Sequence, residues 1–156
     1  MTRVPLADPT LDPFNGILAH LPDVASAWSS LERAFMSPDG LLPMELKEEA
    51  RSEMAQLVGC VFCATVGAPP SQERPSPRQA LASAFALQLA NDYREIDDAM
   101  FEALREEFTN AEIVELVSWL CFKFGANMLG ALWKLPPAND DQRRMYDDVL
   151  AAASVQ

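Results

Sequence analysis

The residues in this sequence whose types and spacing best fit a chemical role are the two cysteines of Cys60-Val61-Phe62-Cys63. On a helix, residues three apart lie on the same side of one turn, so the two sulfurs can form a disulfide with little backbone movement. At a helix N-terminus, the exposed N–H groups stabilise a thiolate and lower a thiol pKa from about 8.5 to roughly 3.5–7.5. By this argument Cys60 is the nucleophile and Cys63 resolves the oxidised intermediate.

Two other interpretations of this cysteine pair remain open. Half of a zinc site needs a second pair of ligands, and the chain offers only His20 and Cys121, which do not form a spaced pair. Both cysteines can also be small buried residues, as free cysteines often are. We expect no metal and no cofactor, a structural or surface role for His20, and a core position for Cys121 within its apolar surroundings.

The elements that must position the dithiol are predicted to be helices. No run of Val, Ile and Thr alternates as in a strand, so the fold class is all-α. Residues 67–77 contain four prolines and are predicted to form a loop. The expected helices are about Pro13 to Met36 with a break near Leu21–Pro22, Pro43 to Val58, a short one from about Cys60, Pro77 to Tyr93, Ile96 to Phe108, one capped by Thr109 or Asn110, and a last one to about Ala153.

The whole chain, residues 1–156, is predicted to form a single domain with an N-terminal arm (about 1–12) and a C-terminal helix (about 139–154). The long helix before Pro136 is apolar from Ile113 to Leu132, where only Glu115 and Lys123 carry charge. Most of the faces of this helix must therefore be covered. A single chain of this size does not have enough other residues to cover them all. We predict an obligate homo-oligomer.

Charge and composition argue against several classes of function. The formal net charge of -11 repels phosphate backbones and anionic lipid, which makes nucleic acid and membranes poor partners. No apolar run approaches the roughly 20 residues of a membrane span, and residues 1–13 lack the pattern of a secretory signal. Three cysteines are an odd number, which disfavours a purely structural disulfide framework. We therefore expect a cytoplasmic protein.

The stretch that leads into the cysteines, Leu42-Pro43-Met44-Glu45-Leu46-Lys47-Glu48-Glu49, resembles the core of the AhpD-like (alkylhydroperoxidase, carboxymuconolactone decarboxylase) family. In that family a helix with a glutamate precedes a CxxC motif that opens the next helix. The glutamate lies twelve residues before the first cysteine, which corresponds to Glu48. A weaker likeness continues from Phe108 to Val117, so the resemblance spans roughly residues 15–133.

This resemblance implies an all-α AhpD-like helical bundle that assembles as dimers, trimers or hexamers. It also implies a thiol-dependent peroxidase or disulfide oxidoreductase, with a hydroperoxide as substrate and a dithiol as reductant. Cys63 then meets the peroxide, Cys60 resolves it and Glu48 acts as the base. These cysteine roles reverse those from the helix dipole, and we follow the family because helix boundaries are uncertain by a residue or two.

Two positions depart from the pattern of the redox-active members, which read CxxCxxxH. Gly67 stands where the histidine would be, and Phe62 replaces a histidine or tyrosine of many members. Neither residue can relay a proton. The alternative prediction is therefore a catalytically reduced scaffold that acts as an oligomeric binding module or as a redox sensor.

Overall fold

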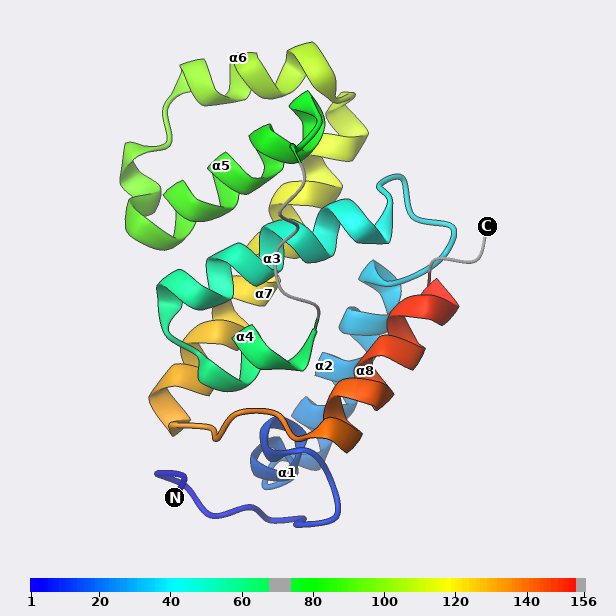
Figure 1. Cartoon of the computed structure of the whole chain (residues 1–156), viewed down its shortest axis with the longest axis vertical. Coiled ribbons are helices and arrows are strands. Elements are labelled where there is room, and N and C mark those ends of the chain that lie inside the picture. Colours follow the sequence, from blue (N-terminus) through cyan, green and yellow to red (C-terminus); the bar gives the residue numbers. More distant parts are fainter. Residues whose placement is uncertain (68–73, 154–156) are drawn as a thin grey trace.

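A computed structural model describes residues 1–67 and 74–153, and these residues form helices and connecting segments without a strand (Figure 1). The predicted all-α class is therefore confirmed. In chain order the elements are α1 (Pro13–Leu18), α2 (Pro22–Phe35), α3 (Met44–Val58), α4 (Val61–Val66), α5 (Pro77–Asp92), the 3₁₀ turn η1 (Tyr93–Glu95), α6 (Asp98–Glu107), α7 (Asn110–Trp133) and α8 (Asp140–Ala153).

Local capping interactions explain why most helix boundaries fall near their predicted positions. Thr109 and Glu112 exchange side-chain and backbone hydrogen bonds, and this capping box begins α7. Gly59 ends α3 with a φ of 79°, a left-handed conformation that glycine adopts without steric cost. Pro22 begins α2, since its missing N–H would be unpaired there in any case, and this separates α2 from α1.

Two boundaries near α6 differ from the prediction. The helix expected to reach Tyr93 ends at Asp92 and gives way to η1. The helix expected from Ile96 begins at Asp98, because the Asp97 side chain accepts the N–H of Met100 and caps it. In the predicted loop, residues 68–73 lie outside the described residues, as does residue 154 of the predicted C-terminal helix.

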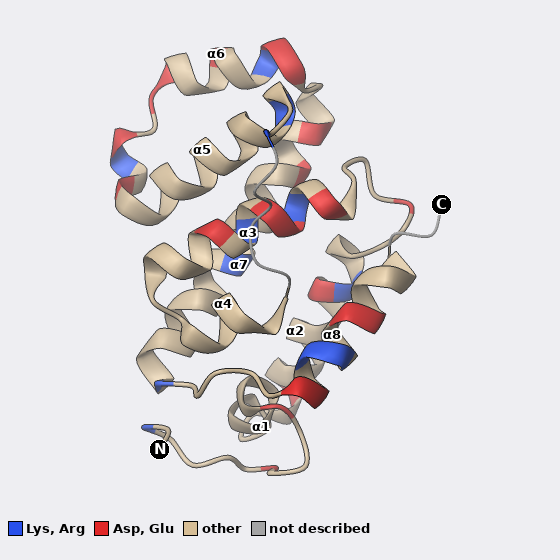
Figure 2. Ribbon diagram, in the orientation of Figure 1, with Lys and Arg blue, Asp and Glu red and all other residues tan. Residues whose placement is uncertain are grey.

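Helices α3 and α7 form the centre of the fold. Figure 1 shows α5 and α6 on one side of this crossing pair, with α2 and α8 on the other, and α3 packs most extensively against α5 and α7. The fully buried Trp119 of α7 donates its indole N–H to the carbonyl oxygen of Lys47 on α3 at 3.1 Å. Acidic residues are prominent on α6 and α8, whereas α4 carries no charged residue (Figure 2).

By length and composition alone, α7 could cross a membrane. The prediction that no apolar run reaches this length was therefore wrong. Core helices of soluble proteins pass the same test, and α7 packs here against α3, α4, α5 and α6. Its outer face still leaves Val114, Met128 and Leu132 exposed.

A buried ion pair ties α7 to α3 and α2. The Lys47 side chain is 1% exposed, and its Nζ donates to Glu115 Oε1 at 2.8 Å and to the carbonyl oxygen of Phe35 at 2.6 Å. Glu115 also accepts the N–H of Leu41 at 2.7 Å. Removal of one partner from such a pair leaves the other charge buried and uncompensated.

We expect Glu115→Ala to lower the free energy of unfolding by about 3 kcal/mol, because the Lys47 ammonium would lose its counter-charge. The matched control is Glu102→Ala, which removes an exposed partner of Arg105 and should change stability by less than about 0.5 kcal/mol. Urea denaturation followed by circular dichroism measures both. If both variants lose the same free energy of unfolding, the buried pair does not contribute more to stability than the exposed one.

Candidate functional site

Cys60 and Cys63 are joined by a disulfide at the junction between α3 and α4. Cys60 is the N-cap of α4, and its Sγ accepts the N–H of Cys63 at 3.1 Å. The left-handed turn at Gly59 ends α3 directly before this pair. The spacing thus brings both sulfurs to one side of a single turn, as expected.

The backbone of α7 covers the two sulfurs. A Cβ atom added to Gly130 would lie 2.3 Å from Cys60 Sγ and 3.1 Å from Cys63 Sγ, so glycine permits the close approach of α7 to the disulfide. Cys60 is fully buried, while Cys63 retains 7% of its exposure. Cys63 is therefore the more accessible of the two.

Arg51 links the predicted glutamate to the dithiol turn. Its Nε lies 2.9 Å from both carboxylate oxygens of Glu48, and its Nη1 donates to the carbonyl oxygen of Cys63 at 2.7 Å. Arg51 is 2% exposed, and its Nη2 has no hydrogen-bond partner among the described residues. Burial opposes its charge, but the neighbouring Tyr146 and Glu48 raise the pKa of Arg51 overall, so the guanidinium stays protonated.

Tyr146 from α8 contacts the same carboxylate. Its hydroxyl donates to Glu48 Oε1 at 2.7 Å, and the Arg51 guanidinium lies 5.7 Å from the centre of its ring. Burial raises the pKa of Tyr146 well above its ordinary value, although Arg51 opposes this shift. The phenol is therefore a protonated hydrogen-bond donor at neutral pH.

Gly67, which stands at the position of the family's histidine, closes this cluster. A Cβ atom added there would lie 2.9 Å from Arg51 Nη2, 3.2 Å from Glu48 Oε2 and 3.2 Å from Tyr146 Cε1. Any side chain at position 67 would have to displace one of these groups. The space beside Gly67 is thus occupied by Arg51 and Tyr146.

His20 does not replace the missing histidine. It is exposed, and its Nε2 lies 3.0 Å from the carbonyl oxygen of Pro5 in the N-terminal arm. This agrees with the structural or surface role predicted for it. The histidine borders an open, largely apolar hollow, whose other lining residues are Val4, Ile17, Leu18, Leu21 and Trp133.

The prediction that Cys121 lies in the hydrophobic core is wrong. Cys121 is the exposed free cysteine, and partial burial raises the pKa of its thiol. Its neighbours Trp119 and Leu120 are fully buried. A helix turns by about 100° per residue, which carries position 121 off the buried face of α7.

Sequence reasoning found Glu48, Cys60 and Cys63 but missed two residues of the cluster. Arg51 follows Glu48 at the i,i+3 spacing of helical ion pairs, and this signal could have identified it. Tyr146 lies 98 residues after Glu48, and no sequence pattern connects the two. No group of three or more His, Cys, Asp or Glu side chains suited to a metal occurs within residues 1–67 and 74–153.

We expect Gly130→Ala to destabilise the oxidised protein, because the new methyl group would overlap Cys60 Sγ. The free energy of unfolding should fall by about 1–3 kcal/mol. The control is Gly125→Ala on the same helix, where a Cβ meets no atom within 4 Å and helix propensity favours alanine by about 1 kcal/mol. If thermal unfolding shows the two variants to be equally stable, α7 does not pack against the disulfide as described.

Comparison with known proteins supports the fold. No protein-family profile and no curated protein sequence matches the chain. Among solved structures, it matches the crystal structure of an alkylhydroperoxidase AhpD core, an uncharacterized peroxidase-related protein from Ralstonia eutropha JMP134. The TM-score is 0.73 at 21% sequence identity, over 91% of this chain and 94% of the other. This chain therefore has the AhpD-like fold that its sequence predicted.

Proposed function

We propose that this chain is a thiol-dependent peroxidase or disulfide oxidoreductase of the alkylhydroperoxidase type. The observation that carries the proposal is the Cys60–Cys63 disulfide, whose Cys63 carbonyl is linked through Arg51 to the carboxylate of Glu48. The AhpD-like fold agrees with this reading. The substrate would be a hydroperoxide and the electron donor an external dithiol.

The reaction needs Glu48, Cys60 and Cys63 together with the hydroperoxide and the external dithiol. Glu48 accepts the thiol proton of Cys63, and the thiolate attacks one oxygen of the hydroperoxide. The O–O bond breaks, the alkoxide leaves as an alcohol with the proton returned by Glu48, and Cys63 becomes a sulfenic acid. Cys60 then attacks that sulfur, water leaves, and the disulfide forms. An external dithiol reduces the disulfide and is itself oxidised, so no metal or organic cofactor is required.

Accessibility supports Cys63 rather than Cys60 as the attacking residue. Cys60 is fully buried beneath Gly130, whereas Cys63 is buried but retains 7% exposure. The Cys60 sulfur also caps α4, where its contact with the Cys63 N–H holds it in position to resolve the intermediate. The opposite assignment, from the helix dipole alone, leaves the nucleophile without access to solvent.

We expect Cys63→Ser to reduce peroxide consumption, with dithiothreitol as donor, to the rate of the donor alone. Cys121→Ser is the matched control and should retain the activity of the parent, because its thiol lies outside the site. Equal consumption by Cys63→Ser and the parent would rule out this function. A parent that forms the disulfide reversibly but consumes no peroxide would instead favour the redox-sensor alternative.

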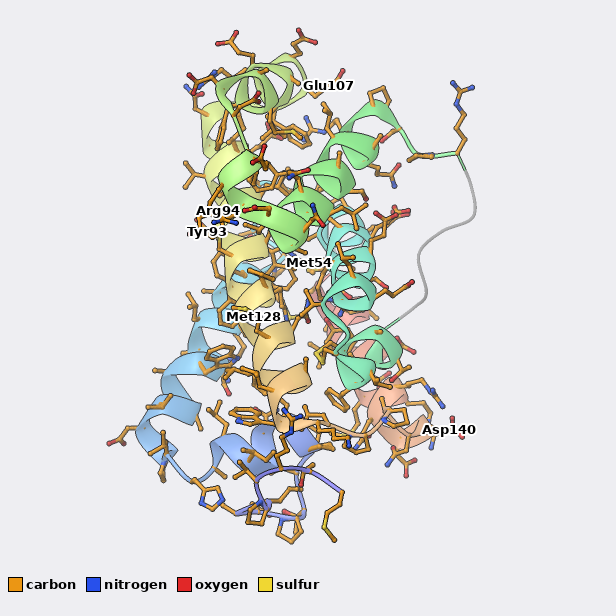
Figure 3. The ribbon with its side chains drawn as sticks, turned by 90° about the vertical axis from the view of Figure 1, so that its left-hand side faces the viewer. Met54, Tyr93, Arg94, Glu107, Met128 and Asp140 are labelled. Atoms are coloured by element: carbon orange, nitrogen blue, oxygen red, sulfur yellow. A yellow bond between two sulfur atoms is a disulfide. The ribbon has the colours of Figure 1, made fainter. Side chains whose placement is uncertain are left out.

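We further propose that the chain is a cytoplasmic homo-oligomer without nucleic-acid or membrane partners, in which a second copy covers the outer face of α7. Figure 3 looks onto this helix around Met128, where no ribbon of the chain lies in front of it. Val114, Met128 and Leu132 of α7 are exposed, and large apolar side chains on a surface commonly mark an interface.

Sedimentation velocity at micromolar concentration tests this assembly. We expect the parent to sediment as an oligomer and the double variant Met128→Glu/Leu132→Glu to dissociate, because two buried carboxylates would oppose association. Met145→Glu on the exposed surface of α8 is the control and should not change the sedimentation coefficient. A monomeric parent under these conditions would contradict the proposal.

A further inference from the structure

We infer that Tyr146 is a positioning residue of the dithiol site, which orients the Glu48 carboxylate from the C-terminal helix α8. The inference deepens the proposed peroxidase function and rests on it. Tyr146 belongs to an element that lies outside the stretch resembling the AhpD-like family, and it reaches the site only through the tertiary fold.

The contacts hold Glu48 from two sides. Tyr146 Oη binds Oε1 at 2.7 Å from α8, and Arg51 Nε contacts both oxygens at 2.9 Å from within α3. Arg51 also binds the Cys63 carbonyl oxygen, so the orientation of the carboxylate is coupled to the backbone at the attacking cysteine. Without the tyrosine hydroxyl, the bond to Arg51 would be the one left to Oε1 among the described residues, and the carboxylate would have greater freedom to rotate.

Gly67 and Tyr146 are complementary in space. The Tyr146 ring atom Cε1 lies 3.2 Å from the point that a Cβ at position 67 would occupy. A histidine at position 67 would therefore compete with the tyrosine for the same volume beside Glu48. The absence of a side chain at Gly67 leaves room for the Tyr146 phenol from α8 to contact the carboxylate.

Charged groups around the phenol keep it in its donor form. Arg51 and Glu48 face it from α3, and Glu32 from α2 also acts on both Tyr146 and Arg51. With burial, the two carboxylates disfavour a phenolate, and Arg51 only partly offsets them. The tyrosine can therefore donate to Glu48 throughout the neutral pH range, unlike a histidine, which titrates there.

The test uses Cys60→Ser/Cys121→Ser as background, so that Cys63 is the sole thiol. The rate of its oxidation by hydrogen peroxide is followed against pH through capture of the sulfenic acid. We expect Tyr146→Phe, which removes only the hydroxyl, to lower this rate by about 10- to 100-fold and to alter its pH profile. Tyr93→Phe, at an exposed tyrosine of η1, is the control and should match the background. An unchanged rate and pH profile in Tyr146→Phe would overturn the inference.

A swap of the two complementary positions adds a second readout. In the same background, Gly67→His alone should slow oxidation, because the new side chain would crowd Arg51 Nη2 and compete with the Tyr146 ring for the space beside Glu48. Tyr146→Ala should also be slow, and the double variant Gly67→His/Tyr146→Ala should be faster than either. Absence of this rescue would contradict a shared position beside Glu48. Tyr146→Phe keeps the ring and decides the question if the alanine variants unfold.

The experiments distinguish failure of the inference about Tyr146 from failure of the proposed peroxidase function. If the background does not react with peroxide at all, the peroxidase proposal fails. Alkylation of Cys63 by iodoacetamide against pH, in the same variants, then tests the tyrosine independently of peroxide. A pH profile that differs between Tyr146→Phe and the background supports the positioning role, and identical profiles overturn it.

Discussion

The site depends on one buried guanidinium. Arg51 is almost fully enclosed, yet it carries charge because Glu48 pairs with it and the Cys63 carbonyl oxygen accepts one of its N–H groups. Such a charge is tolerated in the interior only while its partners remain in place. The pairing therefore constrains both the carboxylate that would act as base and the backbone of the cysteine that it would serve. Through Arg51, the carboxylate on α3 and the cysteine backbone on α4 are held in a fixed relation to each other.

Close packing supplies the second constraint on the dithiol. The α7 backbone reaches the sulfurs only because residue 130 is glycine, and the apolar cluster that includes Phe14, Phe62 and Leu135 surrounds them. A disulfide enclosed in this way has little contact with solvent, and Cys63 is the less buried of its two residues. Burial thus distinguishes two residues that are chemically identical.

The glycine at position 67, which departs from the family pattern, fits the packing around it. Gly67 removes a titratable side chain, and the volume next to it is taken by Arg51 and Tyr146. A phenol and a guanidinium do not titrate near neutral pH in these surroundings, because the pKa values of both Tyr146 and Arg51 are raised. At this site the carboxylate of Glu48 is therefore held by two hydrogen-bond donors, a guanidinium and a phenol.

The sequence by itself determined the helices and the motif, because both depend on interactions between residues a few positions apart. Capping at Thr109, the stop at Gly59 and the i,i+3 spacing of Cys60 and Cys63 are local, and their predictions are confirmed. The tertiary structure decided what lies around the sulfurs. Tyr146 approaches Glu48 across 98 positions of chain, and Cys121 faces outward, since long-range packing selects which side of a helix is buried.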